Sequence, residues 1–85
     1  MTLKIEKYAD QYGTTIRLIG RVQAEHLPEL ETQIKESGSK VALDLEELNL
    51  VDVDAVRFLG SCELAGVTLV NCSHYIRDWI GKERD

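Results

Sequence analysis

Two aspartates separated by one residue offer the clearest chemistry in the sequence. Asp52 and Asp54 stand just before and at the start of an expected helix. An aspartate at such a position accepts backbone N–H groups of the first turn and complements the positive end of the helix dipole. It also presents a permanent negative charge, unlike the removable charge of a phosphorylated residue. The pair is therefore expected to cap the helix, to offer a permanent charge to a partner, or to do both.

The same aspartates belong to an acidic loop that also contains Glu46 and Glu47. Carboxylate oxygens bind hard cations such as Ca²⁺ and Mg²⁺, so a metal site is one interpretation. The spacing of these residues matches no calcium-binding loop, however, and an ordinary solvated acidic surface is the better explanation. We therefore predict no metal site here.

Cys72 is the other residue with reactive potential, since it precedes an expected helix start at Ser73 and His74. A thiol at a helix N-terminus can have a lowered pKa and react as a thiolate. Cysteine is more often a small buried residue, which is the expectation here. The sequence contains no glycine-rich phosphate loop and no nucleophile elbow. No catalytic residue and no cofactor is expected, although a small enzyme or nucleotide-binding protein that uses Asp52, Asp54 or Cys72 stays open as an alternative.

The composition narrows the classes of partner. The chain of 85 residues has a formal net charge of −5. Residues 22–63 carry ten acidic and three basic side chains, so the middle of the chain is the acidic part. This charge disfavours a nucleic-acid partner and favours a basic one. No apolar run is long enough to cross a bilayer, and two cysteines are too few for a disulfide scaffold. A cytoplasmic protein without direct membrane insertion is expected.

The apolar pattern predicts four strands and three helices in the order β-β-α-β-α-β-α. The strands are expected at residues 2–8, 14–19, 41–45 and 67–70, with a hairpin turn at 10–13 and a loop at 46–51. The first helix contains Leu27, Leu30 and Ile34, with Pro28 in its first turn, and the second spans residues 54–64. The inner face of the last helix is expected to comprise Tyr75, Ile76, Trp79 and Ile80. The alternative is that Tyr75, Ile76 and Trp79 form an exposed aromatic patch for a partner. His26 is expected at the surface.

This order predicts an α/β fold. Strands that alternate with helices form a largely parallel sheet, here with one antiparallel hairpin strand at the start. Polar residues alternate along the second and third strands, so one sheet face is expected to be partly solvated and the three helices to lie mainly on the other. Residues 1–85 are expected to form a single domain of this four-stranded mixed sheet and three helices.

Three stretches of the chain resemble STAS domains, the fold of anti-sigma-factor antagonists. They are residues 18–22 before an acidic helix, residues 41–45 with 51–56 after a short loop, and residues 66–71. In antagonists of this family the second signature reads Asp-Ser-Ser-Gly-Leu, and its second serine is phosphorylated by an anti-sigma kinase, which releases the partner. The resemblance places Asp52 at the family aspartate, Val53 at the first serine, Asp54 at the phosphoacceptor and Ala55 at the glycine.

The resemblance implies a regulatory protein-interaction module of bacterial signalling and transcription regulation rather than an enzyme. Its partner would be an anti-sigma kinase-like protein or an ABC ATPase subunit. The partner-binding surface would include residues 52–56, that is Asp52, Val53, Asp54, Ala55 and Val56. Gln23 would join them, since it stands where the family commonly carries an aspartate after the second strand. The phosphorylatable serine is missing. An alternative setting for the same fold is a STAS subunit of a bacterial ABC complex that transports phospholipid.

Overall fold

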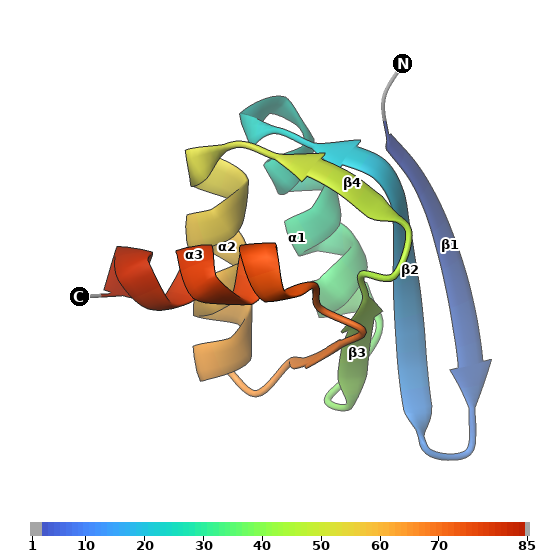
Figure 1. Cartoon of the computed structure of the whole chain (residues 1–85). Coiled ribbons are helices and arrows are strands. Elements are labelled where there is room, and N and C mark those ends of the chain that lie inside the picture. The colour runs from blue at the N-terminus through green and yellow to red at the C-terminus, as the bar shows by residue number, and fades with distance from the viewer. Residues whose placement is uncertain (1–2, 85) are drawn as a thin grey trace.

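Five strands and three α-helices follow one another in the computed structural model, which describes residues 3–84 (Figure 1). The strands are β1 (Leu3–Asp10), β2 (Gly13–Val22), β3 (Val41–Asp44), β4 (Leu48–Val51) and β5 (Thr68–Val70). The helices are α1 (Leu27–Glu36), α2 (Val53–Leu64) and α3 (His74–Arg84), and a 3₁₀ turn, η1 (Ala24–His26), precedes α1. The predicted hairpin, helices and strands are present; residue 2 of the first predicted strand lies outside the described residues.

The hairpin of β1 and β2 is antiparallel, with Leu3 opposite Gly20 and Asp10 opposite Gly13. The backbone N–H of Tyr12 donates to Asp10 Oδ1 at 2.8 Å, which closes the turn. Gly13 has a φ of +141°, and a Cβ built on it would lie 2.5 Å from the backbone oxygen of Lys40. Only glycine fits this position, because both the backbone conformation and the neighbouring loop exclude a side chain.

β2 is the central strand of the sheet, since it pairs with other strands on both sides. On the side away from β1 it pairs in parallel with β3 through residues 14–17 and with β4 through residues 20–22. β5 pairs in parallel with β3. The predicted fold class, a mixed sheet with one antiparallel strand at the start, is confirmed, but the sheet has five strands because part of the predicted loop at 46–51 is β4. Its Leu48 and Val51 are buried at 8% and 5% exposure, so tertiary packing makes a strand of this short apolar segment.

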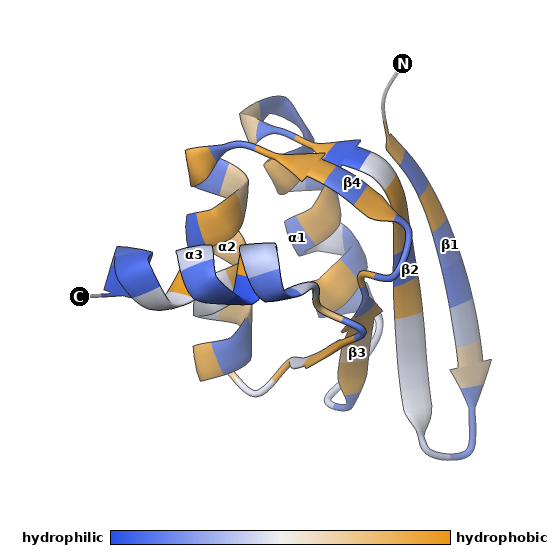
Figure 2. Cartoon of the chain, viewed as in Figure 1, coloured by the Kyte–Doolittle hydropathy of each residue, from blue (hydrophilic) through white to orange (hydrophobic). Residues whose placement is uncertain are grey.

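The core lies between the sheet and the three helices, which cover one face of it (Figure 1). Figure 2 shows apolar positions on the elements that enclose this space. Strands β2, β3 and β4 and the three α-helices contribute buried side chains. The largest fully buried ones are Ile16, Leu18, Leu30, Leu43, Leu45, Leu59, Ile76 and Ile80. The prediction that the helices pack mainly on one face is therefore confirmed.

Two predicted orientations are wrong. Tyr75 is 58% exposed, because α3 packs along α2 through a narrow stripe formed by Ile76 and Ile80. Trp79 is partly buried, and its ring centroid lies 5.7 Å from that of Tyr75. The His26 side chain is only 18% exposed, since its Nδ1 accepts the backbone N–H of Gln23 at 3.0 Å and so faces its own turn.

Candidate partner-binding surface

Asp52 joins two segments that are far apart in the sequence. It is the N-cap of α2, and its Oδ1 accepts the backbone N–H of Ala55 at 2.8 Å. Its Oδ2 accepts the backbone N–H of Ala24 at 3.0 Å. One carboxylate thus satisfies a donor in the first turn of α2 and a donor in the segment after β2. The loop that carries Asp52 is held at both oxygens, so its main role is structural.

Asp54 has a different environment. It is exposed in the first turn of α2, and within residues 3–84 its carboxylate makes no hydrogen bond or ion pair. The charge complements the helix dipole and is otherwise directed to the solvent. Of the two aspartates predicted to be functional, Asp54 is therefore the one that can meet a partner.

Gln23 lies next to this loop, because its neighbour Ala24 is bonded to Asp52. Gln23 itself is half-buried and begins η1, where its carbonyl accepts the N–H of His26 at 2.8 Å. The structure thus brings together the two segments that the sequence analysis assigned to one surface. The end of β2 and the end of β4 lie side by side, with Val22 opposite Val51, which explains the proximity.

The remaining predicted site residues divide by exposure. Val53 is 36% exposed beside Asp54, whereas Ala55 and Val56 are fully buried. Ala55 and Val56 therefore belong to the core and hold α2 in place, and a partner cannot touch them in this conformation. Sequence analysis missed Leu50, an apolar side chain on β4 that is 45% exposed. Leu48 and Val51 are buried while Asn49 and Leu50 are exposed, so the segment lacks the alternation that indicates a strand.

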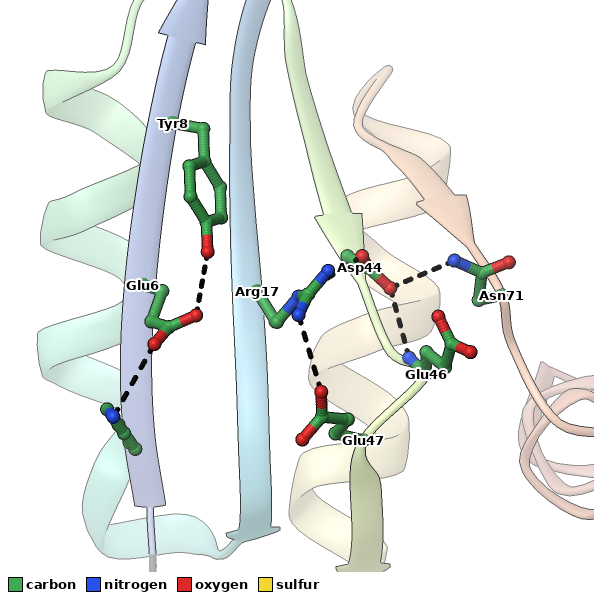
Figure 3. A network of polar contacts seen from close by, with 8 residues as sticks. Glu6, Tyr8, Arg17, Asp44, Glu46, Glu47 and Asn71 are labelled. Atoms are coloured by element: carbon green, nitrogen blue, oxygen red, sulfur yellow. Dashed lines mark hydrogen bonds and ion pairs between the residues drawn. The ribbon is translucent and has the colours of Figure 1, made fainter.

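A polar network covers the opposite, helix-free face of the sheet (Figure 3). Arg17 on β2 lies 3.5 Å from Asp44 Oδ2 and 3.3 Å from Glu47 Oε2. Asp44 Oδ1 also accepts the side-chain N–H of Asn71 and the backbone N–H of Glu46, both at 3.1 Å. Asp44 points away from the core, as predicted, yet only 8% of it is exposed because these neighbours enclose it.

The bonds to Asp44 favour its ionised form. The pKa of Asp44 is lowered chiefly by the side-chain hydrogen bond from Asn71. The hydrogen bond from the Glu46 backbone and the positive charge of Arg17 lower it further, whereas burial raises it. Further along the same face, Tyr8 donates to Glu6 at 2.7 Å. Alternation along the strands predicted polar side chains on this face, but it could not predict which of them pair.

The acidic loop does not form a metal centre in the part of the chain that the structure describes, where no three potential ligands converge. Glu47 is paired with Arg17, Asp52 bonds backbone N–H groups, and Glu46 is exposed. The carboxylates of this loop therefore have separate surroundings.

Neither cysteine has the properties of a nucleophile. Cys62 is buried, and burial raises its pKa to about 11. Cys72 is half-buried rather than fully buried, and burial also raises its pKa. Because the thiolate is the reactive form, a raised pKa disfavours reaction at both thiols. The prediction of an inert residue at Cys72 agrees with this environment better than the alternative of an active thiol.

A hollow lies away from this surface. It has a volume of about 350 Å³ and opens at the start of β2 and β3, among Tyr12, Thr15, Lys40 and Thr68. Gln23 and Asp52 lie at the other end of these strands. No helix among residues 3–84 has both the length and the apolar character needed to span a membrane.

The arrangement of elements is similar to a solved structure described as an anti-sigma-factor antagonist, a STAS domain from Rhodobacter sphaeroides. The two share 15% sequence identity and superpose with a TM-score of 0.63 over 82% of this chain and 87% of the other. Neither a protein-family model nor a curated protein matches the sequence. The likeness shows that the chain has the STAS fold, as the resemblance predicted.

Proposed function

We propose that this chain is a non-catalytic, cytoplasmic regulatory module that binds a protein partner through residues 52–55, in the manner of an anti-sigma-factor antagonist without its phosphorylation switch. These residues are the N-cap and first turn of α2, where Val53 and Asp54 are the exposed side chains. The observation that carries this proposal is the contrast between Asp52 and Asp54. Asp52 fixes the loop through two backbone bonds, while Asp54 beside it is exposed and unpaired within residues 3–84.

The negative charge of Asp54 indicates the kind of surface that the partner presents. An exposed carboxylate in the first turn of α2 attracts a basic surface over a Debye length of about 8 Å at physiological salt. Val53 beside it adds an exposed apolar contact. The partner is therefore a protein with basic and apolar residues at the contact, and the resemblance suggests an anti-sigma kinase-like protein or an ABC ATPase subunit.

Several observations support a role without catalysis. The two thiols have raised pKa values, and Asp52 is engaged with backbone N–H groups. Asp54 has no second titratable group bonded to it in the described chain, so no acid–base pair forms at this surface. A site of this kind can bind and steer a partner but lacks the groups that transfer protons or attack a substrate.

The test uses the partner recovered by pull-down from the native organism, then purified and measured by surface plasmon resonance. Asp54→Lys should slow association several-fold and weaken its salt dependence, because steering acts on the association rate. Glu36→Lys, which makes the same charge change at an exposed position in the last turn of α1, should have a much smaller effect. If both variants bind as the natural chain does while folded, residues 52–55 are not the docking surface.

A further inference from the structure

The sheet has an unfilled position beside β4. β2 pairs on one side with β3 and then with β4, so these two strands lie nearly end to end. β5 covers the far edge of β3 through residues 42–44, but among residues 3–84 no strand pairs with the far edge of β4. The chain leaves the sheet after β5 at Asn71, whose φ is 55°, and turns toward α3 (Figure 3). The far edge of β4 is called its free edge below.

In the described part of the chain, the sheet has two other open edges, β1 and the far side of β5 (Thr68–Val70). The free edge of β4 differs in chemistry from that of β1. β1 carries the charged residues Lys4, Glu6, Lys7 and Asp10, and charges of this kind discourage pairing with another chain. β4 has the sequence Leu-Asn-Leu-Val, without a charge, and its Leu50 is 45% exposed. The Leu48 N–H already donates to the Leu45 carbonyl at 3.1 Å. The backbone groups from Asn49 to Val51 that face away from β2 are therefore the ones open to a short added strand, without charged side chains in the way.

Carboxylates lie at both ends of β4. Glu46 and Glu47 precede it, and Asp52 and Asp54 follow it. Glu46 and Asp54 are exposed, and neither forms an ion pair within the described part of the chain. The nearest cation on β2 is Arg21, opposite Leu50, and β2 lies on the side of β4 away from the free edge. A segment placed along the free edge would thus have the apolar Leu50 near its middle and the negative charges of Glu46 and Asp54 near its two ends.

We propose that the free edge of β4 binds an extended segment of the protein partner as an added strand, with an apolar residue toward Leu50 and basic residues at its two ends. In strand addition the main-chain hydrogen bonds supply affinity and the alternate side chains supply specificity. A second copy of this chain is a poor occupant, because its own β4 would place like carboxylates against these. The inference rests on the proposed function, since it describes the segment by which that partner is recognised.

A peptide probe tests strand addition directly. The probe is Lys-Arg-Thr-Val-Thr-Val-Arg-Lys, added to the full ¹⁵N-labelled chain. We expect NMR shift changes and slowed hydrogen exchange at the backbone amides of β4, and none at those of β1. A peptide methylated at alternate backbone nitrogens should bind at least about tenfold more weakly, because it loses main-chain donors. A version with glutamates in place of the basic residues should not bind.

A matched pair of variants locates the contact on this chain. Leu50→Lys should weaken the peptide several-fold, since it removes the apolar contact and repels the basic ends. Leu64→Lys makes the same change at the far end of α2, where the leucine is 76% exposed, and should leave the affinity unchanged. Both residues are exposed, so both variants should fold.

The proposal is overturned if the methylated peptide binds equally well, if the β4 amides do not respond at millimolar peptide, or if they respond to dimer formation by this chain instead. These outcomes are separable from failure of the proposed function. When the peptide leaves β4 unaffected while Asp54→Lys still slows the purified partner, only the strand-addition inference is wrong. When β4 binds the peptide but the Asp54 variants do not alter partner binding, only the assignment of the loop is wrong.

Discussion

Asp52 Oδ2 accepts the backbone N–H of Ala24 at 3.0 Å, across 28 positions of sequence. The same carboxylate caps α2 through its other oxygen. The link holds the segment after β2 against the start of α2, and both segments belong to the proposed docking surface. A single side chain therefore sets the shape of that surface, while its neighbour Asp54 supplies the free charge.

Removal of the Asp52 carboxylate should destabilise the chain. Asp52→Ala loses the N-cap of α2, which typically costs about 1 kcal/mol, and also leaves the Ala24 N–H without its acceptor. We expect a loss of roughly 1–2 kcal/mol in the free energy of unfolding, measured by urea denaturation. Asp54→Ala, two residues away, should cost well under about 1 kcal/mol because it removes only an exposed dipole interaction. Equal losses in the two variants would contradict the stabilising role of the hydrogen bonds that Asp52 accepts from Ala24 and Ala55.

Gly13 and Gly81 offer an opposed pair of substitutions. Gly13→Ala should destabilise the hairpin by more than about 1 kcal/mol, because the residue has a φ of +141° and its Cβ would meet the Lys40 carbonyl at 2.5 Å. Gly81 lies within α3, and nothing is within 4 Å of a Cβ placed there. Gly81→Ala should therefore stabilise the chain by roughly 0.5–1 kcal/mol. Thermal unfolding followed by circular dichroism measures both, and a fall in the melting temperature with Gly81→Ala would contradict the prediction.

Local patterns in the sequence predict most of the fold. The alternation in β1 and β2 with Gly13 between them, and the spacing of Leu27, Leu30 and Ile34, depend on neighbouring residues alone. β4 escaped prediction because its buried and exposed residues do not alternate, and its strand conformation comes from pairing with β2 and from the burial of Leu48. A short apolar run of this kind does not differ locally from a loop.

The candidate surface was predictable only in part. The resemblance selected Asp52, Asp54 and Gln23, and the ends of parallel strands place their segments together. Asp52 is bonded to backbone N–H groups and Asp54 is exposed, and this difference is set by tertiary structure. The exposure of Tyr75 was missed for a related reason, since periodicity shows that a helix has an apolar side but not how wide its contact with α2 is.

The polar network on the open sheet face should make stability depend on acid pH. The pKa of Asp44 is lowered in the folded chain, chiefly by the hydrogen bond from Asn71. A lowered folded-state pKa stabilises the fold above the unfolded value of about 3.9, and this stability is lost as the pH falls through the folded pKa.

Asn71→Gly tests this dependence, because glycine accepts the φ of 55° and lacks the amide donor. An NMR titration of the Asp44 carboxyl carbon should show a higher pKa in this variant than in the natural chain. Urea denaturation should show that the variant gains less stability between acid and neutral pH. An unchanged pKa of Asp44 would mean that Glu46 and Arg17 alone hold the carboxylate ionised.

The last prediction concerns phosphorylation of the loop. Residues 51–59 contain no serine or threonine, and Asp54 stands where the STAS resemblance places the phosphoacceptor. A carboxylate forms no stable phosphoester, so incubation with an anti-sigma kinase and ATP should leave the intact mass of the natural chain unchanged. Asp54→Ser places a hydroxyl at an exposed position of the first turn, where a serine is tolerated and a kinase can reach it.

The variant should gain a single phosphate, about 80 Da in intact-mass analysis, because phosphorylation adds one phosphoryl group to one hydroxyl. The phosphate carries a charge of about −1.5 to −2 at neutral pH, so the modified variant should resemble the natural chain in its salt-dependent attraction to a basic partner. Peptide mapping must place the phosphate at residue 54. Asp52→Ser is the control and should be phosphorylated less, since position 52 faces the backbone of Ala24 and Ala55. A stable phosphate mapped to residues 51–59 of the natural chain would contradict the prediction, and equal phosphorylation of the two serine variants would show that the kinase does not recognise the exposed position.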